Sequence, residues 1–131
     1  MRLKTKEFDD VVVIEVKGNL MGGPDLQKFR ELLHKLLDKG KKKVVVDVKN
    51  VKFMNSAGLG TLISGLTTMR NSGGDLKIAN PTDKIESLLM ITRLIRVFET
   101  YNSVEEAVAS YKKRTKNRLA IIPIISVRAN P

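Results

Sequence analysis

The sequence predicts an α/β domain with a mixed, largely parallel β-sheet and about four helices packed against it. Short segments of β-branched residues alternate along the chain with segments whose apolar residues recur at helical spacing. Residues 44–46 are three consecutive valines, which is typical of a central strand buried on both faces. The expected order of elements is ββαβαβαβα, and 131 residues are enough for one such domain.

A β-hairpin is expected at the start of the chain. Residues 3–8 alternate weakly between apolar and polar side chains, and residues 11–16 are rich in β-branched side chains. Asp9 and Asp10 between these segments predict the turn. A loop is then expected over residues 18–23.

The first helix is expected to begin at Pro24, because proline suits the first helical position. Asp25 follows it in the first turn, where a helix favours negative charge. The apolar side chains at helical spacing are Leu26, Phe29, Leu32, Leu33, Leu36 and Leu37. Gly40 is expected to end the helix in a left-handed conformation. His34 falls on the polar side and is expected at the surface.

Strands and helices alternate in the second half of the chain. A buried strand is expected over residues 43–48, a loop over residues 50–55, and a second helix that opens at Ser56. Gly73 and Gly74 are expected to stop this helix.

Two further strand–helix units complete the predicted domain. A strand is expected over residues 75–79, and residues 80–82 open a third helix. A last short strand is expected over residues 96–99. Ser103 and Glu106 have the spacing of a capping box and predict the start of a fourth helix.

Composition excludes several classes of function. The chain has no cysteine, so disulfides, cysteine-ligated zinc and thiol catalysis are excluded, and its single histidine argues against a metal site. No stretch approaches the roughly 20 apolar residues that span a bilayer, and the first residues lack the apolar core of a signal peptide. We expect a cytoplasmic protein with no cofactor and no membrane association.

The positive charge is concentrated in the last part of the chain. Residues 112–131 contain six basic residues and no acidic one, so they supply +6 of the net charge of +10. We therefore expect a domain over residues 1–111 and a basic, then apolar, tail over residues 112–131. The apolar part, residues 119–127, contains a proline and predicts an edge strand or an extended docking peptide. The basic part could extend the last helix, contact an acidic partner or be disordered.

The start of the second helix carries the most specific functional signal. Ser56 suits an N-cap whose hydroxyl accepts a hydrogen bond from the N–H of Gly58 or Leu59. Gly58 and Gly60 leave the first turn bare, so that a phosphate or a partner could approach closely. A helix N-terminus also favours an added anion.

Residues 44–60 resemble the signature of the STAS family of anti-sigma factor antagonists: a strand, an aromatic-Met pair, then Ser-Ala-Gly-Leu-Gly at the helix start. The resemblance covers roughly residues 3–111, in order and without large gaps. Its other parts are Gly18-Asn19-Leu20, Gly73-Gly74-Asp75-Leu76, residues 92–99 and residues 103–107.

The resemblance implies a regulatory binding module of the STAS fold and not an enzyme. Members of the family bind an anti-sigma factor that is also a serine kinase, and this binding releases a sigma factor. The kinase phosphorylates the serine at the position of Ser56, which breaks the complex, and a PP2C-type phosphatase reverses the step. The residues expected to contact the partner are Asn55, Ser56, Ala57, Gly58, Leu59 and Met21.

Two positions depart from the family pattern. Asn55 stands where an acidic residue usually precedes the serine, and Met21 stands where the loop commonly carries an acidic residue. If the missing charge at Asn55 helps the kinase, phosphorylation would be slow or absent. Both Ser56 and Asn55 could also be local helix caps and nothing more.

Other functions remain as alternatives. A STAS domain could act as a scaffold or accessory module without phosphorylation. The basic tail could bind nucleic acid, although the chain has only two tyrosines, four phenylalanines and no tryptophan for stacking on bases. Asp47 could be a ligand or a base, but a hydrogen-bonded carboxylate at a strand end is the favoured interpretation.

Overall fold

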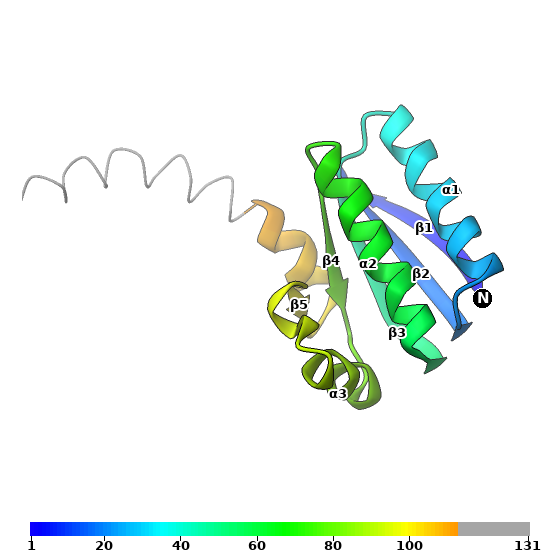
Figure 1. Ribbon diagram of the computed structural model, residues 1–131. Coiled ribbons are helices and arrows are strands. Elements are labelled where there is room, and N and C mark those ends of the chain that lie inside the picture. Colours follow the sequence, from blue (N-terminus) through cyan, green and yellow to red (C-terminus); the bar gives the residue numbers. More distant parts are fainter. Residues whose placement is uncertain (113–131) are drawn as a thin grey trace, which may run out of the picture.

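The computed structural model describes residues 1–112, which form a five-stranded sheet with helices on both faces (Figure 1). The strands lie in chain order: β1 (Arg2–Phe8), β2 (Val11–Leu20), β3 (Lys43–Met54), β4 (Asp75–Ala79) and β5 (Thr100–Tyr101). The pair β1–β2 is antiparallel and the other pairs are parallel. The predicted α/β fold with a mixed, largely parallel sheet is confirmed.

The helices divide between the two faces of the sheet. In Figure 1, α1 (Pro24–Asp38) and α2 (Ser56–Asn71) lie side by side over one face. Their apolar sides join valines of β2 and β3 in the main core, to which α3 (Asp83–Ile91) adds Ile85 and Leu89. The helix over residues 104–112 packs with Ala107 and Tyr111 against the opposite face.

Most predicted helix ends are confirmed. Pro24 begins α1, and Gly40 follows its end with φ of 76° and donates from its N–H to the carbonyl of Leu37 over 2.9 Å. Thr82 caps α3, and the Ser103 hydroxyl accepts a hydrogen bond from the Glu106 N–H over 3.0 Å. His34 is exposed, as expected.

Two predicted loops are wrong in part, because β2 and β3 run further than their apolar patterns. The loop expected over residues 18–23 is strand as far as Leu20, and the loop expected over residues 50–55 is strand as far as Met54. The two extensions pair with each other through Leu20 and Met54, after register shifts that include one at Gly18. Gly18 has φ of +92°, which its missing side chain permits.

The last predicted strand is also wrong. Residues 96–99 do not form it; the short 3₁₀ helix η1 (Leu94–Arg96) precedes a strand at Thr100–Tyr101. Arg93 has φ of 64° and turns the chain at the end of α3, and Phe98 is then buried in the main core. Phe98 therefore anchors a turn, and pairing with β4 begins only at the Glu99 carbonyl, which accepts a hydrogen bond from the Ile78 N–H over 2.9 Å.

A buried lysine lies under the helix over residues 104–112. Lys77, on β4, has a fully buried side chain whose Nζ donates to the Ser110 hydroxyl over 2.6 Å. The same Nζ lies 4.1 Å from the centre of the Tyr111 ring and 3.5 Å from a Glu99 carboxylate oxygen. These contacts supply the paired environment that a buried ammonium requires.

Basic side chains at the hairpin end of the sheet are paired with acids. Lys41 contacts Glu7 at 2.8 Å, Lys43 contacts Asp10 at 2.7 Å, and Lys112 pairs with Asp9. Hydrogen bonds from the two lysines to the carboxylates lower the pKa of Glu7 and the pKa of Asp10. The charges at this end are therefore largely compensated within the domain.

The contact between α1 and α2 predicts opposite effects for two glycines of α2. A Cβ added at Gly65 would lie 2.5 Å from the buried ring of Phe29, whereas a Cβ at Gly60 would meet nothing within 4 Å. We expect Gly65→Ala to lower the free energy of unfolding by about 1–3 kcal/mol through overpacking. We expect Gly60→Ala to raise it by about 0.5–1 kcal/mol, because alanine is the better helix former. Urea unfolding of both variants measures this, and equal effects would contradict the packing described for Gly65.

Candidate functional site

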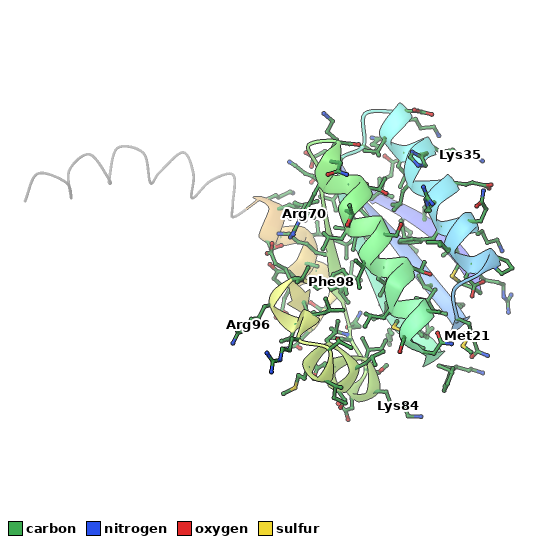
Figure 2. All side chains as sticks on the ribbon, viewed as in Figure 1. Met21, Lys35, Arg70, Lys84, Arg96 and Phe98 are labelled. Carbon is green, nitrogen blue, oxygen red and sulfur yellow. The ribbon has the colours of Figure 1, made fainter. Side chains whose placement is uncertain are left out.

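The start of α2 packs directly on the end of β2. A Cβ on Gly58 would lie 1.8 Å from the carbonyl oxygen of Leu20, so only glycine fits there. Gly22, in the loop after β2, packs against the same turn of α2, since a Cβ on it would lie 2.8 Å from the Cβ of Ala57. Met21, between these contacts, is thereby held beside the first turn of α2, and Figure 2 shows it at this end of the molecule.

Asn55, and not Ser56, is the N-cap of α2. Its side-chain Oδ1 accepts a hydrogen bond from the Gly58 N–H over 2.8 Å, and its carbonyl accepts one from the Leu59 N–H over 2.9 Å. The prediction that the Ser56 hydroxyl caps the helix is wrong, because the extended backbone of Asn55 places the cap one residue earlier. Ser56 is the first helical residue.

The cap leaves the Ser56 side chain at the surface. Ser56 and Ala57 are exposed, Asn55 is half-buried, and the Met21 side chain is 39% exposed. Of the residues expected to contact a partner, Gly58 is buried and Leu59 is only 2% exposed. The structure therefore brings Met21, Asn55, Ser56 and Ala57 together as one surface, which we call the α2 surface, and places Gly58 and Leu59 beneath it.

The α2 surface suits a bound or covalently added anion. The first N–H groups of a helix have no acceptor within the helix, and the aligned peptide dipoles make this end partly positive. No acidic residue lies in the first turn of α2 itself, and the Asp25 carboxylate accepts a hydrogen bond from the Met21 N–H over 3.2 Å.

The rest of the described chain shows little that points to other chemistry. Within residues 1–112, no group of three or more His, Asp or Glu side chains could hold a metal ion. No helix in this part of the chain is long and apolar enough to cross a membrane. Asp47 lies within β3 and accepts hydrogen bonds from the Asn80 amide at 3.1 Å and the Lys49 N–H at 3.0 Å. It is a hydrogen-bonded carboxylate, as favoured from the sequence.

Comparisons with known proteins agree with the fold. A family model described as STAS domain matches residues 2–107. A Staphylococcus aureus anti-sigma-B factor antagonist is 28% identical over 96 residues, which are 72% of this chain and 86% of that protein. A Thermotoga maritima protein designated a candidate anti-sigma factor antagonist is 26% identical over 110 residues, 83% of this chain and 96% of that protein.

A solved structure is similar over most of its length. The crystal structure of a candidate anti-sigma factor antagonist from Thermotoga maritima superposes with a TM-score of 0.74 at 27% identity. The match covers 82% of this chain and 92% of that one.

The cap predicts a graded series of stabilities at the start of α2. Asn55→Ala removes the acceptor for the Gly58 N–H and should lower the free energy of unfolding by about 0.5–2 kcal/mol. Asn55→Asp keeps the acceptor and adds a negative charge at the helix N-terminus, so its stability should equal or exceed that of the wild type. Ser56→Ala is the matched control and should change the stability little, because the side chain is exposed. A larger loss for Ser56→Ala than for Asn55→Ala in urea unfolding would contradict the assignment of the cap.

Proposed function

Because the chain belongs to the STAS domain family, we propose that it is an anti-sigma factor antagonist that is switched by phosphorylation of Ser56. In this proposal it binds an anti-sigma factor that is also a serine kinase, and the binding releases a sigma factor. The observation that carries the proposal is the exposed Ser56 on the first turn of α2, beside Met21. The names of the similar proteins support it.

The α2 surface has the properties of a binding site for a folded partner. Its side chains are small or unbranched, so a partner can approach the helix closely and remove the first turn from water. The cap at Asn55 and the contact of Gly58 with Leu20 fix this turn before binding. A preformed surface loses little conformational freedom on association, which favours affinity.

Phosphorylation of Ser56 would change the charge of this surface without unfolding it. A phosphate adds about −1.5 to −2 charges and three acceptor oxygens. The helix N-terminus tolerates them, because its N–H groups and its dipole favour an anion. A partner packed on Ser56 would instead have to bury the dianion, and affinity would fall through desolvation and repulsion. A PP2C-type phosphatase would restore the binding form.

Asn55 bears on how readily this step occurs. Its amide caps the helix as an aspartate would but carries no charge that could orient a kinase. A binding module that is never phosphorylated is therefore the second candidate function. It would use the same α2 surface and differ only in lacking the switch.

Residues 1–111 would be the binding domain, and the protein would act in the cytoplasm without a cofactor. The basic tail predicted from residue 112 onward lies outside the described residues except for Lys112, which continues the helix over residues 104–112. In this proposal the domain makes no direct contact with nucleic acid or membrane.

The test is a phosphorylation assay on the full chain. The purified protein is incubated with ATP and a lysate of its source cells, and its intact mass and modified peptides are measured. We expect a single phosphoryl group on Ser56, none in Ser56→Ala, and faster modification of Asn55→Asp. Absence of a phosphoryl group on Ser56 in both the wild type and Asn55→Asp, while other proteins of the lysate are phosphorylated, would refute the switch and favour the second candidate.

A further inference from the structure

Unpaired basic side chains gather around the end of β3. A hollow of about 550 Å³ lies beside the start of β1 and the later parts of β2 and β3. Exposed cationic side chains line it, and no acidic side chain does. The cationic residues are Arg2 on β1, Lys17 on β2, and Lys49 and Lys52 on β3. Arg2 and Lys17 are direct cross-strand neighbours, a pairing of like charges that costs stability.

This arrangement differs from the hairpin end of the same sheet. There Lys41, Lys43 and Lys112 each have a carboxylate partner. Within residues 1–112, none of the four cations around the hollow takes part in an ion pair. Four cations without an ion-pair partner in this part of the chain therefore lie together at the end of the strands where α2 begins.

An apolar groove adjoins the basic hollow. It has a volume of about 340 Å³, lies between the end of β3 and α3, and shares Val51 and Lys52 with the hollow. Two large apolar side chains in its lining are unusually open, since Phe53 is 49% and Ile91 is 79% exposed. Exposed apolar side chains beside a charged rim are typical of a protein-binding surface.

We propose that the basic hollow and the apolar groove together form a docking surface for an acidic, amphipathic segment of a protein partner. Acidic residues of the segment would lie against Lys49 and Lys52, and its apolar residues would enter the groove between Phe53 and Ile91. Charge complementarity selects the acidic partner, because four cations lie there without an acidic neighbour in the hollow.

The apolar half of this docking surface argues against a nucleic acid as the occupant. Interfaces with nucleic acids are polar and strongly positive, and single strands need several aromatic side chains for stacking. Phe53 is the one aromatic side chain in the lining of the two hollows.

The docking surface is distinct from the α2 surface but continuous with it along the chain. Met54 lines the groove and Asn55 caps α2, so a protein seated on α2 could place a neighbouring segment here. Binding at the docking surface does not depend on phosphorylation, because Ser56 lines neither the hollow nor the groove.

The test uses a fluorescein-labelled peptide that combines glutamates with spaced leucines, followed by fluorescence anisotropy with the full chain. We expect saturable binding that weakens about tenfold in the Lys49→Glu, Lys52→Glu double variant. Ile91→Ser should weaken peptide binding as well, because it removes an apolar side chain that lines the groove. The Ile91 side chain is 79% exposed, so this substitution leaves the core intact. Arg30→Glu, on the exposed side of α1 and outside both hollows, is the control and should leave binding unchanged.

Three results would overturn the proposal. One is a peptide affinity that is the same in the wild type and in all of these variants. Another is equal affinity for a peptide with serines in place of the leucines, because binding would then depend on charge and not on the apolar groove. The third is tighter binding of a single-stranded oligonucleotide, or of vesicles containing phosphatidylglycerol, that the double variant abolishes.

Discussion

The close approach of α2 to the end of β2 is the constraint on which the candidate site depends. The position of Gly58 leaves no room for a side chain, because a Cβ would lie 1.8 Å from the Leu20 carbonyl oxygen. This contact requires β2 to extend to Leu20 and β3 to Met54, so that the chain turns into the helix directly beside the loop. Met21 and Ser56, distant in sequence, therefore share one surface.

The distribution of charge gives the two ends of the sheet different roles. At the hairpin end, acidic and basic side chains compensate one another, and the buried Lys77 is paired beneath the helix over residues 104–112. At the other end, positive side chains without an ion-pair partner and exposed apolar side chains lie near a helix N-terminus, and Asp83 is the one acidic side chain in the lining of the two hollows. Like charges paired across strands cost the isolated domain some stability, and in the proposed docking an acidic partner would offset this cost.

The order of elements could be predicted from the sequence, but the local geometry at the start of α2 could not. The valines of β3, Pro24 and Gly40 act through local conformational preferences, which a sequence shows directly. The polar ends of β2 and β3 become strand only because they pair with each other, which no local pattern shows. Asn55 and Ser56 are both good caps, and the backbone conformation decides between them. The burial of Lys77 and the exposure of Ile91 depend on tertiary packing alone.

In the proposed function, a partner with a serine-kinase domain binds the α2 surface only while Ser56 carries no charge. The most direct measurement is affinity capture from the source cells with tagged wild type, Ser56→Ala and Ser56→Glu chains, followed by mass-spectrometric identification of the bound proteins. We predict that an anti-sigma factor with a kinase domain is captured by wild type and Ser56→Ala and is lost with Ser56→Glu. Capture of the same proteins in equal amounts by all three chains would contradict it.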